Sequence, residues 1–360
     1  MREEGYITDK NNSCEYIRLA VKSDICAIRE IWRNIFTADE DYLDIIFNDL
    51  FPLLDAYVYT IDEEIVSVAF AIPIALVQRN IKDSTHQKEK HYYGRYLYGV
   101  ATTDRARGRG LSRRVVKHIK ECCTAAGEDF IITRPAEESL FPFYRAQGFN
   151  LPLYRQETTV YLIQPVESSK LYEASTDATD YNSDISANEL YNLRRELSQN
   201  LFVWSAPILE CILKLFKVEK SKIRHFPEGK KYFIASCYTQ ESGTNTIQLP
   251  NNVHTCQNPE AQENQRRLII QENNFTSLKE LLSHLHKMEI SNTHPYATEF
   301  DKIGLIEIIQ PIKYSTERVH IDFDHKTTEE RVSEFALCMP LSGKITDELI
   351  QNSFFNFTME

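Results

Sequence analysis

The stretch that decides the fold is YGVATTDRARGRGLS, residues 98–112. It closes an aromatic, β-rich run from Tyr92 to Thr102 and leads into residues 111–126, whose apolar positions recur at helical spacing. The connection between them is rich in glycine and arginine. A glycine-containing turn before a helix presents backbone N–H groups at the positive end of the helix dipole, which suits a phosphate group. The sequence therefore predicts a strand, a phosphate-binding loop and a helix in this order.

The loop resembles the acetyl-CoA loop of the GNAT superfamily of N-acyltransferases, which follows the pattern Arg/Gln-x-x-Gly-x-Gly/Ala. Two registers fit. Arg105, Gly108 and Gly110 match the pattern letter for letter, whereas Arg107, Gly110 and Ser112 keep the more usual distance from Val100. The second register is preferred. The resemblance implies acetyl-CoA as co-substrate, held by Val100, Ala101, Thr102, Arg105, Arg107, Gly108, Arg109, Gly110, Leu111 and Ser112, with Arg113 and Arg114 also available to its phosphates.

Two other interpretations of the loop compete with this one. An ordinary surface turn with a solvated basic edge would need no ligand. A dinucleotide site of the G-x-G-x-x-G kind requires a third glycine where Arg113 stands. Neither explains the strand before the loop and the helix after it as well as the acetyl-CoA loop does.

The resemblance also implies two catalytic groups. The backbone N–H of Val100 is expected to stabilise the oxyanion that develops during acyl transfer, an effect of roughly 3 kcal/mol. Residues 140–149, LFPFYRAQGF, resemble the family's L-x-x-F-Y-x-x-x-G-F stretch, which places Tyr144 on the tyrosine that protonates the departing thiolate. A phenol suits that role because its pKa of roughly 10 lies above a thiol's roughly 8.5. On its own, Tyr144 would be read as core packing.

The sequence does not identify the general base, and it lacks one side chain that contacts the cofactor in many relatives. Glu137 and Glu138 are candidates for the base, but they are equally well explained as first-turn acids of a helix, and the terminal residue Glu360 is a third candidate. The position after the strand at 130–133, where relatives often carry a polar side chain, reads Arg134-Pro135-Ala136, a departure from the family. The His284-Leu285-His286 pair would point apart on a helix, so no metal is expected.

The predicted elements around the loop describe a mixed α/β fold. Two helices, about 23–36 and 39–51, precede a hairpin of strands at 56–61 and 65–72, and a helix from Pro135 to Gly148 and a strand at 151–164 follow the short strand at 130–133. We expect residues 1–165 to form the catalytic GNAT domain, 166–186 a polar linker, and 187–360 a second, diverged GNAT-like domain without a cofactor loop. Within the last of these, the patterns predict a helix at 277–287 and strands at 232–238, 244–249, 267–272, 303–309, 335–340 and 354–358.

The composition of the chain restricts the classes of partner that we expect it to bind. The 360 residues carry a net charge of −11, which disfavours nucleic acid and is compatible with a cationic amine. The eight cysteines show no C-x-x-C pair, and no apolar run approaches the roughly 18 residues that span a membrane. A secretory signal is not evident, so we expect a cytoplasmic protein without a membrane partner. A homo-oligomer is left open.

Together these patterns predict an N-acetyltransferase that moves acetyl directly from acetyl-CoA to a primary amine on a small molecule or peptide. The rival hypothesis is a CoA-binding regulatory or scaffold protein without turnover. The intact loop and Tyr144 favour the enzyme. The acceptor cannot be deduced from the fold, because function depends on the pocket.

Overall fold

The structure is a computed structural model of the chain. It describes residues 14–79, 89–155, 185–195, 200–218, 333–351 and 353 with their side chains, together with the strand backbone at 5–8, 156–162, 222–226, 231–239, 266–273, 303–311, 326–332 and 354. The predicted phosphate loop and the strand and helix on either side of it lie within the described ranges.

The chain divides into two compact units. The first comprises Met1–Arg155, Ser186–Glu219 and Glu334–Glu360, and the second comprises Gln156–Ile185 and Lys220–Ser333. This division differs from the expected boundaries at 165 and 187, because two later segments pack with the N-terminal part. The assignment of a catalytic and a cofactor-free domain stays a prediction.

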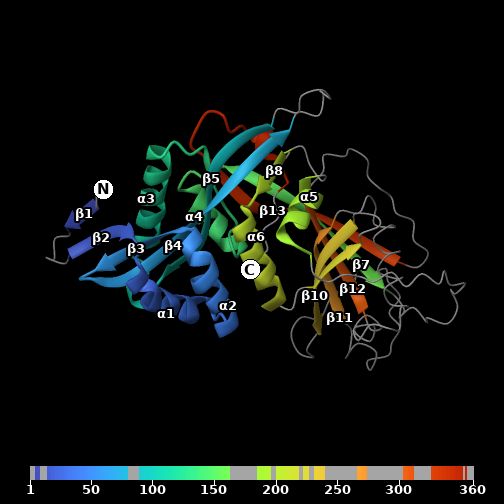
Figure 1. Cartoon of the computed structure of the whole chain (residues 1–360), viewed down its shortest axis with the longest axis horizontal. Coiled ribbons are helices and arrows are strands. Elements are labelled where there is room, and N and C mark those ends of the chain that lie inside the picture. Colours follow the sequence, from blue (N-terminus) through green and yellow to red (C-terminus); the bar gives the residue numbers. More distant parts are fainter. Residues whose placement is uncertain are drawn as a thin grey trace, which may run out of the picture. The chain divides into compact units, whose positions relative to one another are not determined.

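A mixed sheet with helices on both faces makes up the first unit (Figure 1). Its strand order is β1-β2-β3-β4-β5-β6-β13-β7, with β8 on β4 and β14 on β8. The strands are β1 (Gly5–Thr8), β2 (Cys14–Leu19), β3 (Asp55–Ile61), β4 (Glu64–Arg79), β5 (Glu89–Thr102), β6 (Phe130–Thr133), β7 (Leu151–Leu162), β8 (Asn200–Val203), β13 (Lys326–Pro340) and β14 (Ser353–Phe354). Residues 156–162 of β7 and 326–333 of β13 belong to the second unit. The α-helices are α1 (Ile25–Phe36), α2 (Glu40–Asp44), α3 (Leu111–Ala125), α4 (Phe141–Arg145), α5 (Ala187–Arg195), α6 (Ala206–Val218) and α9 (Asp347–Gln351).

The prediction of a mixed α/β fold is confirmed. Helix α2 continues as a π-helix, Ile45–Leu50, and a 3-10 turn, Phe51–Leu53, so the second predicted helix is present but irregular. Strand β2 was not anticipated. A 3-10 turn, Lys22–Asp24, precedes α1 and runs directly into it at Ile25, so the predicted start at Ser23 lies inside this turn. The Asp24 carboxylate accepts hydrogen bonds from Arg18 and from the N–H of Val21, the residue before the turn.

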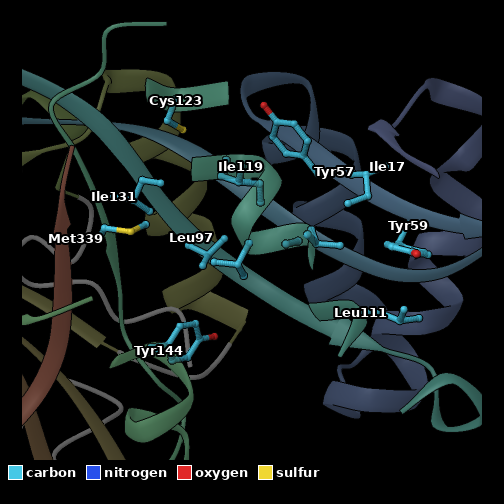
Figure 2. Packing of buried hydrophobic residues seen from close by; sticks show 14 of the residues in the cluster. Ile17, Tyr57, Tyr59, Leu97, Leu111, Ile119, Cys123, Ile131, Tyr144 and Met339 are labelled. Carbon is cyan, nitrogen blue, oxygen red and sulfur yellow. The ribbon is translucent and has the colours of Figure 1, made fainter. Parts of the chain in front are cut away.

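The two faces of the sheet carry separate apolar layers. On one face Trp32 of α1 stacks on Phe70 of β4, with ring centroids 4.9 Å apart. On the other face α3 buries Val115 and Ile119 against the sheet, in the cluster drawn in Figure 2. Alternation along the strands explains this, because successive side chains point to opposite faces. Helices α1 and α3 therefore hold the central strands between them.

Strand β4 is long enough to pair with two strands along one edge. Its residues 64–71 pair with β3, and Ala75–Gln78 pair antiparallel with β8. Helix α6 follows β8 and buries Ile212 and Phe216. Lys214 on its exposed side bonds to Asp49 at 2.8 Å. Residues 186–219 therefore extend the first unit's sheet and cover it.

Strand β13 lies between β6 and β7 although it comes late in the chain. It pairs antiparallel with β6, from Leu337 opposite Thr133 to Pro340 opposite Phe130. Leu337 and Met339 are buried in the same cluster as α3. The catalytic half predicted from residues 1–165 thus shares its sheet with residues from beyond that boundary.

Asp129 holds the segment that follows β13 by hydrogen bonds to its carboxylate. Its carboxylate, 4% exposed, accepts hydrogen bonds from Tyr93 N–H at 3.1 Å, Ser342 Oγ at 2.9 Å and Lys344 Nζ at 2.9 Å. Burial alone would raise the pKa of Asp129, but these donors outweigh it and the pKa lies below its ordinary value. The ionised carboxylate is therefore the form that the fold stabilises.

The second unit contains the strands β9 (Lys222–Phe226), β10 (Lys231–Thr239), β11 (Arg266–Asn273) and β12 (Ile303–Pro311), in the order β12-β11-β10-β9. Strands β10, β11 and β12 correspond to strands predicted at 232–238, 267–272 and 303–309. The predicted strand at 244–249, the helix at 277–287 and most of the strand at 354–358 lie outside the described residues. The second GNAT-like copy stays a prediction.

We expect Asp129→Asn to lower the free energy of unfolding by about 1.5–3 kcal/mol at pH 7, the usual contribution of hydrogen bonds to a charged group. Because the pKa of Asp129 is lowered, its contribution is present above roughly pH 4 and is lost as the pH falls through the folded-state value. Urea denaturation at pH 7 and pH 3 measures the difference. Asp104→Asn, at a side chain 85% exposed, is the control. Equal losses at both pH values would contradict the assignment.

Candidate active site

The two edges of β5 are paired over different lengths. Along one edge β5 pairs with β4 from Glu89 to Thr102. Along the other it pairs in parallel with β6 only from Gly94 to Leu97, where β6 ends at Thr133. Beyond Leu97 the backbone of β5 therefore faces a position that β6 does not occupy.

A β-bulge lies in that half of β5. Val68 pairs with Ala101 and Phe70 with Tyr98, so Gly99 and Val100 together oppose Ala69. Such a bulge leaves an extra residue without a ladder partner. Gly99 has φ +58°, and a Cβ there would lie 2.2 Å from Trp32 Cζ2. The close approach of Trp32 and the positive φ explain the glycine, and the bulge leaves the predicted oxyanion donor, Val100 N–H, beside the unpaired edge of β5.

The predicted phosphate loop connects β5 to α3. It begins with a 3-10 turn, Asp104–Ala106, and ends at Gly110, the residue that precedes helix α3. Gly108 and Gly110 have φ +79° and +73°, and a Cβ on either would meet nothing within 4 Å. No side chain caps the first turn of α3. The glycines thus serve the backbone conformation, and the space beside them is open.

Three hydroxyl groups bind the start of the loop to the sheet. Ser67 Oγ on β4 lies 2.8 Å from Thr102 Oγ1, which lies 2.7 Å from Ser112 Oγ in the first turn of α3. Ser67 also donates to the carbonyl of Ala101 at 2.7 Å. Two of the predicted cofactor residues, Thr102 and Ser112, are therefore hydrogen-bonded to each other, while Leu111 is a buried core residue.

The loop arginines all have acidic partners. Arg105 pairs with Glu64, and Arg107 pairs with Asp104 at 2.9 Å and donates to the carbonyl of Thr102. Arg109 and Arg114 both bind the carboxylate of Glu15 on β2, at 2.6 and 3.3 Å. This carboxylate is buried, unlike those of Glu64 and Asp104. Arg113 is exposed. The arrangement keeps the arginines around the loop while balancing part of their charge.

Tyr144 reaches the point where β5 and β6 part. The Thr133 hydroxyl at the end of β6 donates to the carbonyl of Leu97 at 3.0 Å, and its interaction with the Tyr144 phenol lowers the pKa of that phenol. The ring packs edge-on against Phe149, 5.6 Å between centroids, in the cluster that includes Leu97 and Ile131 (Figure 2). Burial raises the pKa of Tyr144 to about 12. The phenol is therefore both a core residue and a protonated group at the parting of the strands.

The segment after β6, Arg134-Pro135-Ala136, is where the sequence departs from the family pattern. It lies beside Tyr96 of β5, where burial raises the pKa of the phenol and the Arg134 side chain and backbone lower it. Of the three candidate bases, Glu137 and Glu138 are exposed, and Glu137 accepts a hydrogen bond from Ser139 at 3.1 Å. Glu360 lies outside the described residues.

Within the described ranges, no group of three His, Cys, Asp or Glu side chains is placed to hold a metal ion. None of the helices described there is both long and apolar enough to span a membrane.

Comparisons with known proteins agree on the fold. A protein of unknown function from Enterococcus faecalis V583, described as a probable N-acyltransferase, matches with a TM-score of 0.60 at 13% identity, covering 90% of this chain and 72% of its own. Eis1 from Mycobacterium abscessus matches with a TM-score of 0.55 at 11% identity, covering 91% and 73%. The chain has the GNAT fold. A GCN5-related N-acetyltransferase from Anabaena variabilis matches with a TM-score of 0.55 at 10% identity, covering 91% and 73%.

These matches extend over most of the chain, because coverage of about nine-tenths exceeds what the first unit alone supplies. No protein-family model matches the sequence, and no curated protein does either. At such low identities the likeness shows the fold and leaves the activity to the residues of the site.

Sequence reasoning missed several residues of this site. Glu15, Ser67 and Thr133 hold the loop and the strand ends, yet each lies in an ordinary strand. One signal was present for Glu15: it alternates with Ile17 and Leu19, the residues of β2 that pack on the α3 side. An acidic side chain in an apolar row indicates a buried partner.

We expect Gly99→Ala to destabilise the fold by about 3 kcal/mol, because the new methyl group would overlap Trp32 at a backbone position with φ +58°. Gly110→Ala is the matched control, since its φ of +73° carries a similar backbone cost but its Cβ meets open space. That change should cost about 1–2 kcal/mol. Urea denaturation compares the two, and equal losses would show that Trp32 does not constrain the bulge.

Proposed function

We propose that the protein is an N-acetyltransferase that moves acetyl directly from acetyl-CoA to a primary amine on a small molecule or peptide. One observation carries the proposal. The bulge at Gly99 and Val100, the end of β6 pairing at Leu97 and the buried phenol of Tyr144 all occur where β5 leaves its second neighbour. An acyl-transfer site needs an oxyanion donor and a proton source at one point, and this arrangement supports both.

The residues of the loop fit a CoA pyrophosphate. Gly108 and Gly110 leave open space beside the backbone, and the first turn of α3 has no side-chain cap competing for its N–H groups. Arginines 105, 107 and 109 in the loop add positive charge. Backbone donors, dipole and guanidinium groups together are a recurrent way of binding phosphate.

When bound, acetyl-CoA supplies an activated acetyl thioester. The chain's own contribution is positional. Val100 N–H would donate to the oxygen on which negative charge develops, and it is held rigidly because Gly99 is fixed against Trp32. Tyr144 is buried and Val100 is partly buried in the same apolar cluster, which limits the access of water to these groups.

Tyr144 would hold the proton for the departing sulfur. With its pKa raised to about 12, the phenol stays protonated at neutral pH. Complete transfer to a thiolate of ordinary pKa would be uphill, but the burial that raises the phenol's pKa disfavours a thiolate anion at the same place as well. Donation of a hydrogen bond that strengthens as the C–S bond breaks needs no free phenolate.

We expect one acetyl-CoA site per chain, because the glycine loop before a helix occurs once in the sequence. Isothermal titration should give a stoichiometry near one. Gly110→Asp should abolish binding while the chain stays folded, since it places a carboxylate beside the phosphate position. Affinity within threefold of wild type in a folded variant, or two sites per chain, would contradict the loop assignment.

Tyr144→Phe retains the ring but removes the proton. We expect kcat to fall on the order of 10² or more, with little change in CoA affinity. Because burial raises the pKa of Tyr144 to about 12, the loss should be similar at pH 7 and pH 9. Amine-dependent thiol release with acetyl-CoA measures it, after a screen of amines identifies an acceptor.

A donor with a more acidic leaving thiol provides the control for Tyr144→Phe, because such a sulfur needs less help to leave. The defect should be smaller with that donor, whereas a packing defect would slow both equally. If no amine in the screen supports thiol release and CoA still binds, the protein is better described as a CoA-binding regulator without turnover.

A further inference from the structure

Glu15 is a buried acidic side chain for which the acyl-transfer chemistry has no use. It lies at the start of β2, opposite Ile61 of β3, and is 1% exposed. Three side chains bind its carboxylate: Arg109 at 2.6 Å, Tyr59 at 2.6 Å and Arg114 at 3.3 Å. Arg114 also donates to the Tyr59 hydroxyl at 2.8 Å.

These contacts offset the cost of burying a charge. A buried carboxylate is strongly destabilising when unpaired, and its attraction to cations compensates only when hydrogen bonds satisfy its oxygens. Here Oε1 accepts from Arg109, and Oε2 accepts from Tyr59 and Arg114. Burial and the Glu15 carboxylate raise the pKa of Tyr59, so the phenol remains the donor. The cluster of Glu15, Tyr59, Arg109 and Arg114 is thus fully paired at its carboxylate.

The cluster joins the phosphate loop to a distant part of the sequence. Arg109 stands between the two glycines of the loop, and Arg114 lies in the first turn of α3, 94 and 99 residues from Glu15. Gly108 and Gly110 have no Cβ with which to pack, so they cannot anchor the loop themselves. The side chain between them, Arg109, reaches back to the buried carboxylate on β2.

A second carboxylate contacts the same loop, but it is exposed to solvent. Glu64 pairs with Arg105, but these side chains are 57% and 58% exposed. An exposed ion pair of this kind contributes little, because water and salt screen it. The chain thus contains two Glu–Arg contacts on one loop, one buried and one exposed.

Two effects of Glu15 on phosphate binding oppose each other. Its negative charge weakens the attraction of the loop for an anion, but Arg109 and Arg114 carry two positive charges against its one, so the cluster as a whole stays positive. Its hydrogen bonds order two long arginine side chains and the loop between them before the ligand arrives. Ordering such side chains during binding would cost about tenfold or more in affinity. The ordering effect is the larger.

We propose that Glu15 is the positioning residue of the phosphate loop: through Arg109 and Arg114 it holds the loop in the form that receives the CoA pyrophosphate. This inference rests on the proposed function, since it presupposes that CoA binds the loop. Glu15 does not touch the ligand in this proposal. It acts by keeping the loop ordered when no ligand is present.

The experiment compares Glu15→Gln with the matched control Glu64→Gln, using CoA as the titrant and isothermal titration well below both melting temperatures. Each change removes one carboxylate charge that contacts a loop arginine. Glu15→Gln should weaken CoA binding about tenfold, and Glu64→Gln should stay within about twofold of wild type. An affinity for Glu15→Gln equal to or tighter than wild type would overturn the proposal, because loss of charge would then be its only effect.

Two further measurements separate positioning from general stability. 3′-Dephospho-CoA carries the same pyrophosphate, so Glu15→Gln should weaken its binding by the same factor as that of CoA. A loss confined to CoA would mean that Glu15 acts on the 3′-phosphate, which contradicts the proposal. Without ligand, trypsin should cleave after Arg107 faster in Glu15→Gln than in Glu64→Gln, and equal rates would also contradict it.

Tyr59→Phe keeps the test available if Glu15→Gln does not fold. It retains the buried ring and removes the hydroxyl that donates to Glu15 and accepts from Arg114. CoA binding should weaken about threefold, and unchanged affinity would count against the cluster's role. If wild-type protein fails to bind CoA at all, the proposed function fails first, and only the trypsin comparison then bears on Glu15.

Discussion

The site depends on a difference in the length over which the two edges of one strand are paired. Strand β5 is paired with β4 to its end at Thr102 but with β6 only as far as Leu97. Backbone N–H and C=O groups inside a protein need partners, so the unpaired edge either meets a ligand or water or is covered by side chains. The bulge at Gly99 lies on this stretch, and the hydroxyl chain from Ser67 to Ser112 joins the end of β5 to β4 and to α3.

Acidic side chains around the phosphate loop offset the repulsion among its arginines. Successive arginines would repel one another in the absence of an anion, and Glu64, Asp104 and Glu15 each relieve part of that repulsion. Only Glu15 is removed from water, so it alone acts where the dielectric screening is weak. A loop can therefore be rich in positive charge and still be ordered.

The parts of this molecule that sequence could predict are those whose residues are neighbours along the chain. The strand, loop and helix at 92–126 and the stretch around Tyr144 were recognised because local patterning and a family resemblance coincide there. Glu15 could not be joined to Arg109 from sequence, since nothing local records a contact between β2 and the loop. The insertion of β13 beside β6 depends on long-range pairing, which period-two patterning in Phe335–Pro340 indicates as a strand but does not place.

The position of β13 has a consequence for how the chain is made. The edge of β6 that β13 covers belongs to a strand whose four residues are all buried, and the ribosome releases β13 only after some two hundred further residues. Until then that edge presents unpaired backbone beside apolar side chains, the type of surface that other nascent chains can extend into aggregates. The sheet around β6 therefore cannot be completed until residues 337–340 have been synthesised.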